Sequence, residues 1–344
     1  MGVMSEGQKN LTLALQGGGS HGAFTWGVLD RLLEDDRIVI EGISGTSAGA
    51  MNAAVVVAGM AEGGAPAAQA LLERFWEQVA ESGRFSIFQP SLFDRMFGNP
   101  ANLDFSPFYQ GFDLLTRTMS PYQLNPQGTN PLREALTKLI DFEKVRGADG
   151  VKLFISTTNV RTGKIRVFRN HELSADVLLA SACLPHLFQA VEVEGEHYWD
   201  GGFMGNPAMF PLIYNCRATD VLLVEINPIR IEELPTTARG IADRMNSISF
   251  NATMMREMRT IAFVTRLLER HRLTGRSGLR RIFFHMVQAE EEMAAFGVSS
   301  KYNLDWDFLC TLRKLGRERA DQWLAANFDV IGTDSSVDLE KLFF

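Results

Sequence analysis

Short, almost continuously apolar runs alternate along this chain with segments of helical pattern, and this alternation limits the fold more than any other feature. The runs expected to form strands are residues 11–15, 38–43, 151–160, 164–168, 221–226 and 281–287. A strand without a polar side needs cover on both faces of its sheet. The expected helices are residues 22–36, 48–60, 66–80 and 130–141. Strands alternating with helices predict an α/β fold with three layers, helices covering both faces of a mostly parallel sheet.

Two regions interrupt the alternation. Residues 82–128 are rich in Pro, Gly and aromatic side chains, which are Phe85, Phe88, Phe93, Phe97, Phe105, Phe108, Tyr109 and Phe112. A connection of this length is uncommon unless it is functional or has local structure of its own. Residues 236–272 predict one long helix or two, with a methionine cluster (Met245, Met254, Met255 and Met258) that we expect in the core. A further amphipathic helix is expected within residues 300–328.

Charge and cysteine content exclude several classes of protein. The formal net charge of -7 argues against a nucleic-acid binder and gives no bulk attraction to anionic lipid, so any membrane contact would be local and apolar. The three cysteines, Cys183, Cys216 and Cys310, are far apart and predict free thiols rather than a zinc or redox motif. With no apolar signal segment or run of membrane-spanning length, we expect a cytoplasmic protein, in contact with membranes at most peripherally. The oligomeric state is not predicted.

A Gly-x-Ser-x-Gly sequence from Gly45 to Gly49 stands between the expected strand 38–43 and the expected helix 48–60. A serine on a tight strand-to-helix turn is pushed clear of the backbone, and small neighbours keep the turn from colliding with the strand and the helix. The N-terminus of the helix also favours developing negative charge. The pattern arises by chance as well, but its place between a strand and a helix predicts that Ser47 is a nucleophile.

Three consecutive glycines, Gly17, Gly18 and Gly19, follow the first expected strand. Consecutive glycines let backbone N–H groups point into one concavity, which can hold a phosphate or an acyl oxyanion. The loop lacks the Lys-Ser/Thr ending of a Walker A motif. However, Gly17, Gly19 and Gly22 fit the spacing of a dinucleotide fingerprint, and Glu41 is close to the place of its acidic residue. A nucleotide-binding protein that uses the Gly17–Gly22 loop therefore remains an alternative.

The histidines offer no clear catalytic base. His271 lies in a basic run that is typical of a solvated helix end, and His285 lies inside an apolar strand, where a structural role is more common. His21 is next to the glycine loop, but its position does not make it an obvious partner of a serine.

An aspartate is the better candidate. Asp200 is followed by Gly201 and Gly202 after an alternating strand pattern, so its carboxylate has the freedom to point into a cleft. The other Asp-Gly pair, Asp149-Gly150, directly precedes an expected strand and indicates a simple turn. A turn is also an open alternative for Asp200.

In this order, the three motifs resemble those of the patatin-like phospholipases. The resemblance covers about residues 10–228, including a helix, Pro185 and a strand that lead into the Asp-Gly-Gly sequence. It implies a patatin-like variant of the α/β hydrolase architecture with helical additions. We therefore expect a catalytic domain over residues 10–228, in which residues 82–128 serve as a lid or an acyl-chain contact or else as ordinary core. Residues 229–344 would be a mainly helical extension packed on the same domain.

The resemblance also implies a serine lipid acyl hydrolase with a Ser–Asp dyad and no cofactor or metal. Ser47 would be the nucleophile, Asp200 the base, and Gly17, Gly18 and Gly19 the oxyanion hole. The turns around the two catalytic side chains would be supported by Gly45, Gly49, Gly201 and Gly202. The substrate would be phospholipid or a related lipid ester; a storage polyester, a thioester and a non-catalytic lipid-binding role remain open.

Two features need explanation under this hypothesis. The family usually has Arg or Lys where this chain has His21, and a neutral histidine is a weaker electrostatic partner. A free aspartate also has a pKa near ~3.9, which makes it a weak base at neutral pH. We expect burial beside Trp199 and Phe203 to raise the pKa of Asp200.

Overall fold

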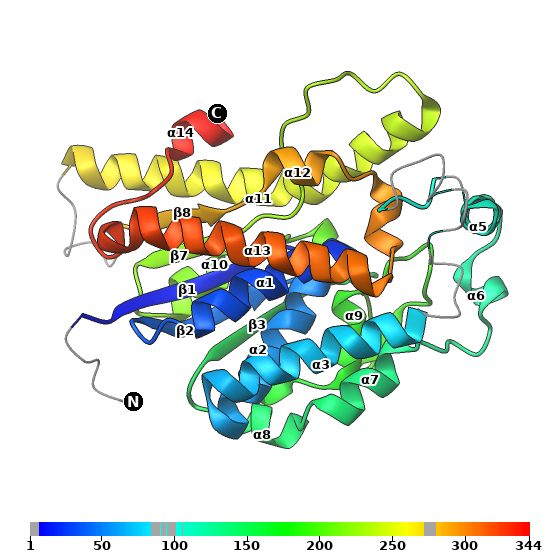
Figure 1. The fold of residues 1–344 in the computed structure, drawn as a ribbon, viewed down its shortest axis with the longest axis horizontal. Helices are drawn as coiled ribbons and strands as arrows, with labels where there is room; N and C mark the ends of the chain where they lie inside the picture. The colour runs from blue at the N-terminus through cyan, green and yellow to red at the C-terminus, as the bar shows by residue number, and fades with distance from the viewer. Residues whose placement is uncertain (1–6, 84–89, 91–93, 95–100, 105, 272–279) are drawn as a thin grey trace.

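A mostly parallel sheet with helices on both faces forms the centre of the molecule (Figure 1). The computed structural model describes residues 7–83, 90, 94, 101–104, 106–271 and 280–344. The described residues place eight strands in one sheet, in the order β5-β6-β3-β2-β1-β7-β8, with β4 paired to β3. The strands are β1 (Lys9–Leu15), β2 (Ile38–Gly45), β3 (Lys152–Asn159), β4 (Ile165–Arg169), β5 (Val191–Val193), β6 (Glu196–Asp200), β7 (Asp220–Val224) and β8 (Phe283–Val287).

Five neighbouring strands are parallel, namely β3, β2, β1, β7 and β8. At the other end of the sheet, β4 and β6 pair antiparallel with β3, and β5 pairs antiparallel with β6. Each expected strand is present, with ends that differ by a few residues. The predicted three-layer α/β class is confirmed. Residues 283–287, within the C-terminal part, add a parallel strand beside β7, so that part of the chain contributes to the sheet as well as to its helical cover.

Helices connect and cover the strands, as the alternation of patterns predicts. Their bounds are α1 (Gly22–Leu33), α2 (Ala48–Gly63), α3 (Ala65–Gly83), α5 (Pro107–Thr118), α6 (Pro121–Leu124), α7 (Leu132–Leu139), α8 (Phe142–Arg146), α9 (Ala175–Ser181), α10 (Phe210–Asn215), α11 (Ala238–His271), α12 (Glu290–Ala294), α13 (Trp306–Asn327) and α14 (Leu339–Phe343). The segment 236–272 thus forms one long helix, which runs along the upper side of the molecule in Figure 1. Within the described ranges, no helix combines the length and the apolar character needed to span a membrane.

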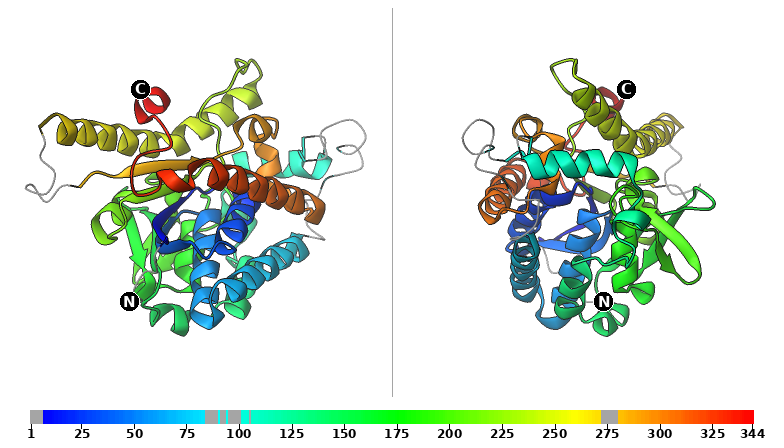
Figure 2. Two further views of the ribbon diagram at one scale, coloured as in Figure 1. Left: turned by 60° about the vertical axis from the view of Figure 1, so that its left-hand side comes forward. Right: turned by 90° about the vertical axis from the view of Figure 1, so that its right-hand side faces the viewer.

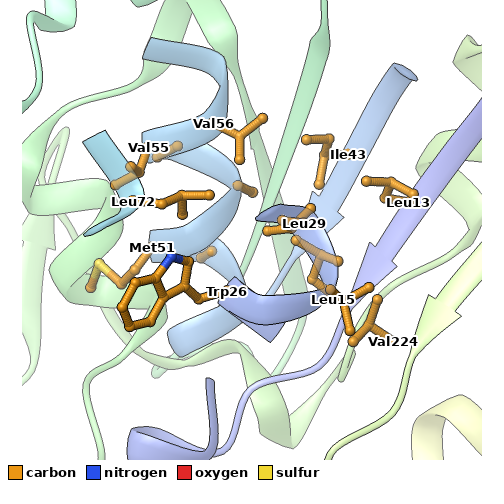
Figure 3. Close-up of a cluster of buried hydrophobic side chains, with 14 of the residues drawn as sticks. Leu13, Leu15, Trp26, Leu29, Ile43, Met51, Val55, Val56, Leu72 and Val224 are labelled. Atoms are coloured by element: carbon orange, nitrogen blue, oxygen red, sulfur yellow. The ribbon is translucent and has the colours of Figure 1, made fainter. Parts of the chain in front are cut away.

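The side chains of each strand alternate between two cores. One face of the sheet packs against α1, α2, α3, α9 and α13. Figure 3 shows side chains of this face, Leu13, Leu15, Ile43 and Val224, gathered around Leu29 of α1. These side chains are completely buried. Burial of a leucine or isoleucine stabilises the fold by about 1.5–3 kcal/mol per side chain.

The other face packs against α10, α11 and α14. Its buried residues include Ala14, Phe154, Leu223 and Phe284 of the sheet, with Met254 and Met258 of α11. These two methionines lie in the core, as expected for the cluster. Met245 does not, since it is 65% exposed near the beginning of α11. The expectation of a buried cluster is therefore wrong for Met245. The rest of α11 packs on the sheet, but its first turns extend beyond the sheet (Figure 2).

The last long helix, α13, packs directly on α1 beside the sheet. A Cβ atom on Gly27 would lie 1.9 Å from the carbonyl oxygen of Arg313, and one on Gly316 would lie 2.0 Å from that of Phe24. The two backbones therefore touch through a reciprocal pair of glycines. Next to this contact, Asp30 is buried and accepts ion pairs at 2.9 Å from Arg313 and 2.7 Å from Arg317. The C-terminal part is thus tied to the first helix of the fold.

The aromatic insert is only partly described. Residues 84–89, 91–93, 95–100 and 105, which include Phe85, Phe88, Phe93, Phe97 and Phe105, lie outside the described residues. Described residues of the insert form α5 and α6, on the right in Figure 1. Tyr109 of α5 is buried, whereas Phe108 is 72% exposed. The helix α7 begins at Leu132, whose N–H donates to the Asn130 side chain at 3.0 Å.

Candidate active site

Ser47 stands on the turn between β2 and α2, as predicted for a nucleophile. Its backbone has φ 55° and ψ -122°, a strained conformation that a residue other than glycine rarely adopts. The side chain is half-buried at the N-terminus of the 16-residue helix α2. The unpaired N–H groups and the dipole of a helix N-terminus favour negative charge at this point.

The small residues of the turn are required by close backbone contacts. A Cβ on Gly45 would lie 2.5 Å from the Gly49 carbonyl oxygen, and one on Gly49 would lie 2.3 Å from that of Leu15. The turn after β2 therefore packs against the end of β1, the neighbouring parallel strand, where Leu15 pairs with Gly45. A Cβ on Gly17 would lie 2.7 Å from the Cβ of Ser47. The glycine loop and the serine turn thus lie side by side at one end of the sheet.

A second serine braces the turn. The Ser47 N–H donates to Oγ of Ser181 at 3.0 Å, and the Ser181 hydroxyl donates to the carbonyl oxygen of Ser156 at 2.7 Å. Ser181 ends α9 and Ser156 lies in β3, and both are completely buried. The strained turn is therefore fixed from the direction of β3, the strand that also pairs with β6.

The three glycines of the loop after β1 differ in their hydrogen bonds. The Gly17 N–H donates to Oδ1 of Asn206 at 2.7 Å, and the Gly17 carbonyl accepts from Nδ2 of Asn227 at 2.7 Å. The N–H groups of Gly18 and Gly19 have no acceptor among the residues that the structure describes. Gly18 is half-buried and Gly19, with φ +59°, is exposed.

Asp200 ends β6 and reaches the same place from the antiparallel side of the sheet. Asp200 pairs with Thr157 of β3, and its side chain is buried. Oδ1 accepts the Gly202 N–H at 2.7 Å. Oδ2 is buried and has no well-formed hydrogen bond within the described part of the chain. A Cβ on Gly201 would lie 2.1 Å from the carbonyl oxygen of Ser156, so the Asp-Gly-Gly turn packs tightly on β3.

Burial raises the pKa of Asp200 to about 7, and hydrogen bonding from the Gly202 N–H and the Ser47 side chain acts in the opposite direction. The Ser47 hydroxyl is therefore near the carboxyl, although the contact is looser than a full hydrogen bond. Catalytic hydrogen bonds often tighten only when substrate is bound. A carboxylate with this pKa is a far better base at neutral pH than a free aspartate.

The neighbours that bury Asp200 differ in part from those expected. Trp199 precedes it on β6 and its side chain points to the opposite face of the strand, because successive side chains alternate. Phe203 packs on Phe250 of α11, with ring centroids 5.2 Å apart. A Cβ on Gly202 would lie 2.3 Å from the ring of Phe250, so α11 closes this side of the site.

The residues that would support other functions are engaged elsewhere. The Glu41 carboxylate accepts the N–H groups of Arg217 and Ala218 at 2.7–2.9 Å and pairs with Lys152 at 3.0 Å. It therefore points away from the glycine loop and does not complete a dinucleotide site. His285 is buried and bonds to Asp220 at 2.9 Å inside the sheet, while the side chain of His271 lies outside the described residues.

Several residues of the site were not foreseen from the sequence. Ser181, Asn206 and Asn227 all hold the two loops by side-chain hydrogen bonds. The asparagines precede prolines near the end of the sheet where strands of open α/β folds place their ligand sites. That position was the available signal for Asn206 and Asn227, but nothing in the sequence singles out Ser181.

Comparison with known proteins gives one strong match. A family model described as patatin-like phospholipase matches residues 13–213. No curated protein sequence matches the chain. Among solved structures, VipD from Legionella pneumophila is similar at 15% identity over 90% of this chain and 68% of that chain, with a TM-score of 0.36. ExoU, solved with SpcU from the type III secretion system of Pseudomonas aeruginosa, is similar at 15% identity over 92% of this chain, with a TM-score of 0.30. The chain spans about half of ExoU (53%).

Proposed function

Because the chain belongs to the patatin-like phospholipase family and is a lipid-hydrolysing esterase, we propose that it cleaves fatty acyl esters of phospholipid or a related lipid through a Ser47–Asp200 dyad. The observation that carries the proposal is the meeting of two distant turns: a strained serine at a helix N-terminus lies beside a buried aspartate with a pKa of about 7. The Gly18 and Gly19 N–H groups, which lack acceptors within the described ranges, support an oxyanion hole next to them.

The proposed reaction has two halves. Oγ of Ser47 attacks the ester carbonyl carbon while Asp200 takes the hydroxyl proton, and the carbonyl oxygen becomes an oxyanion held by backbone N–H groups. The C–O bond to the leaving alcohol breaks, and the alcohol departs with the proton from Asp200. Water then attacks the acyl-enzyme, Asp200 takes its proton, and the fatty acid leaves as the Ser47 hydroxyl is restored.

The loop donors have unequal parts in this proposal. The Gly17 N–H is already bonded to Asn206, so the oxyanion role falls mainly to Gly18 and Gly19. The Ala48 N–H at the beginning of α2 is a further donor of the kind that a serine turn supplies. Gly17 instead provides the space that Ser47 needs, since a side chain there would collide with it.

A panel of acyl substrates tests the proposal. Purified protein is offered phospholipid, glyceride, storage polyester and acyl thioester, and released fatty acid or hydroxy acid is measured. We expect the highest kcat/KM on glycerolipid esters. Turnover of polyester or thioester alone would show that the same site serves another ester, and no turnover of any of them would contradict an enzymatic role.

The pH dependence of kcat/KM reports the proposed base directly. Asp200 must be deprotonated to accept a proton, so activity rises with pH and reaches half of its plateau near pH 7, where burial places the pKa of this carboxyl. At pH 5 we expect about 1% of the plateau rate, provided that circular dichroism shows the protein folded there. An acidic limb near pH 4 would mean that the base has the pKa of an ordinary exposed aspartate.

Exposed apolar side chains near the site suit contact with a lipid surface. On α5, Phe108 and Leu114 are 72% and 64% exposed. On α11, Ile241, Met245 and Ile248 lie at helical spacing on one side and are 46%, 65% and 54% exposed. Figure 2 (right) shows α5 with the first half of α11 above it. We name the last three residues the α11 stripe.

The α11 stripe lies at the same end of the molecule as the proposed base. Burial raises the pKa of Tyr302 to about 12, and the negative charges of Asp113, Asp243 and Asp200 add to this rise. These three acids come from α5, from the beginning of α11 and from the site, and Tyr302 itself packs on Tyr109 of α5 with ring centroids 6.0 Å apart. A lipid that enters from a membrane surface in contact with α5 and α11 would therefore be close to Ser47.

Replacement of the α11 stripe tests this contact. Met245→Asp combined with Ile248→Asp removes two side chains, each worth about 1.5–3 kcal/mol when buried in lipid. We expect at least a tenfold lower rate on zwitterionic phospholipid vesicles and an unchanged rate on a short water-soluble ester. Phe263→Asp, on an exposed position farther along α11, is the matched control and should keep both rates. Equal losses on both substrates would refute a role in surface binding.

A further inference from the structure

A lysine from the C-terminal part of the chain lies against the glycine loop. Lys301 belongs to the 3-10 helix η4 (Val298–Tyr302), which packs on the 3-10 helix η1 (Gly19–His21). A Cβ on Gly19 would lie 2.3 Å from the carbonyl oxygen of Lys301, so the two backbones touch. Beside this contact, His21 and Ser300 form a buried hydrogen bond of 2.7 Å between Nε2 and Oγ.

The ammonium group of Lys301 reaches the loop through one asparagine. Nζ donates to Oδ1 of Asn227 at 2.7 Å, and Nδ2 of Asn227 donates to the carbonyl oxygen of Gly17 at 2.7 Å. Oδ1 of Asn227 also lies 3.4 Å from the place that a Cβ on Gly18 would occupy. The positive charge is therefore one side chain away from the N–H groups that we assign to the oxyanion hole.

Within the described part of the chain, this charge forms no salt bridge, and its side-chain hydrogen bond is the one to Asn227. Burial lowers the pKa of Lys301 to about 8, and the charge of Asp243 raises it from a distance. Burying an ammonium without an ion pair is costly. A negative charge that develops near this ammonium is therefore stabilised by it.

The neighbouring histidine does not supply this charge. Burial lowers the pKa of His21 to about 3, and the nearby positive charge of Lys301 lowers it further, so His21 is neutral at the pH of the reaction. His21 fills a position next to the glycine loop without contributing a cation. Among the described residues, Lys301 is the cation next to this loop.

We propose that Lys301 is a positioning residue of the active site. Its ammonium group holds Asn227, and Asn227 in turn holds the Gly17 carbonyl, so that the N–H groups of Gly18 and Gly19 face the oxyanion. The positive charge of Lys301 also stabilises the negative charge of the transition state. The inference rests on the proposed hydrolase function and adds a residue to it. The oxyanion forms only in the transition state, so Lys301 acts on kcat more than on KM.

The pH profile gives this role a signature that a structural lysine would not have. As pH rises above about 8, Lys301 loses its proton and kcat falls. The pH profile of kcat is therefore bell-shaped, with an acidic limb that reports Asp200 and an alkaline limb that reports Lys301. The titratable groups that face Lys301 are His21 of η1, Asp243 of α11 and the adjacent Tyr302. The pKa values of about 3 for His21 and about 12 for Tyr302 lie far from this alkaline limb.

Three variants test the inference. In Lys301→Met we expect kcat to fall about 10–100-fold on a soluble ester with KM within about threefold, and the alkaline limb to disappear. Lys301→Arg keeps the charge and should retain most of kcat while its alkaline limb moves above pH 10. Lys314→Met removes an exposed lysine of α13 and should change neither kcat nor the limb. Thermal melting identifies a variant that fails to fold. If Lys301→Met fails to fold, the position of the alkaline limb in Lys301→Arg, compared with the wild type, still tests the role of Lys301.

The outcomes separate this inference from the proposed function. If wild-type hydrolysis depends on Ser47 but Lys301→Met keeps kcat within twofold, or if Lys301→Arg keeps the alkaline limb of the wild type, the role of Lys301 is overturned and the dyad stands. If hydrolysis does not depend on Ser47, both proposals are overturned together.

Discussion

Replacing Ser47 with alanine should lower kcat at least 10⁴-fold on every ester that the wild type cleaves, because no other atom can form the acyl-enzyme. Loss of the nucleophile in serine hydrolases costs about 10⁶ in kcat, and the remaining rate comes from the oxyanion hole and substrate binding. A fluorophosphonate probe, which reacts only with an activated serine, should label the wild type and not Ser47→Ala. Labelling is read by mass spectrometry of the intact protein.

The control and the contrary result for this variant are simple. Ser82→Ala removes the hydroxyl of an exposed serine that donates to the carbonyl oxygen of Val79, and it should be labelled and active like the wild type. Alanine also relieves no strain at position 47, where φ stays positive, so the folded state should persist. Ser47→Ala protein that still hydrolyses esters would place the nucleophile elsewhere.

Replacing Asp200 with asparagine should lower kcat about 10³-fold or more. The amide keeps the size of the side chain and can still accept the Gly202 N–H, but it cannot take a proton from Ser47. The acidic limb near pH 7 should also disappear from what activity remains, since that limb reports the carboxyl of Asp200. Asp149→Asn, at the other Asp-Gly pair on the exposed turn before β3, should keep the wild-type rate and pH profile.

Stability provides a second readout for Asp200→Asn. The folded-state pKa of about 7 lies above the ordinary value of 3.8, so folding favours the protonated acid. That favourable contribution is complete below pH 4 and is lost as pH rises through 7, because the carboxylate is then charged and buried. Removing the charge should therefore raise the melting temperature at pH 8 and leave it nearly unchanged at pH 4. A variant that is less stable at pH 8 would contradict burial as the cause of the raised pKa.

The parts of the fold and the site that depend on neighbouring residues were predictable. The strand 221–226 and the helix 22–36 follow from apolar periodicity, and the burial of both sides of β1 agrees with its continuous apolar run. Ser47 and Asp200 stand out because a tight turn at the end of a strand needs small residues beside a reactive one. The close contacts at Gly49 and Gly201 are the physical reason for that requirement.

The remaining parts depend on contacts between segments that no local pattern connects. Ser181 reaches the Ser47 N–H from 134 residues away, and Asn206 reaches Gly17 from 189 residues away. Lys301 lies in a short 3-10 helix without a motif, so its place beside the glycine loop becomes evident only when the chain is folded. Burial of Asp200 was expected beside Trp199 and Phe203, but strand alternation turns the Trp199 side chain away, and Phe250 of α11 closes on Gly202 instead.

The reciprocal glycine contact between α1 and α13 has a consequence for the folding of the chain during its synthesis. Asp30 and its partner Arg313 are 283 residues apart, so α1 leaves the ribosome long before the helix that covers it. Contacts of such long range are formed late and slow the folding of a domain. Until α13 arrives, the apolar side of the segment carrying the glycine loop stays open to water, and a nascent chain of this length needs protection from aggregation. The portion that matches the family model, residues 13–213, is therefore not expected to be an autonomous folding unit.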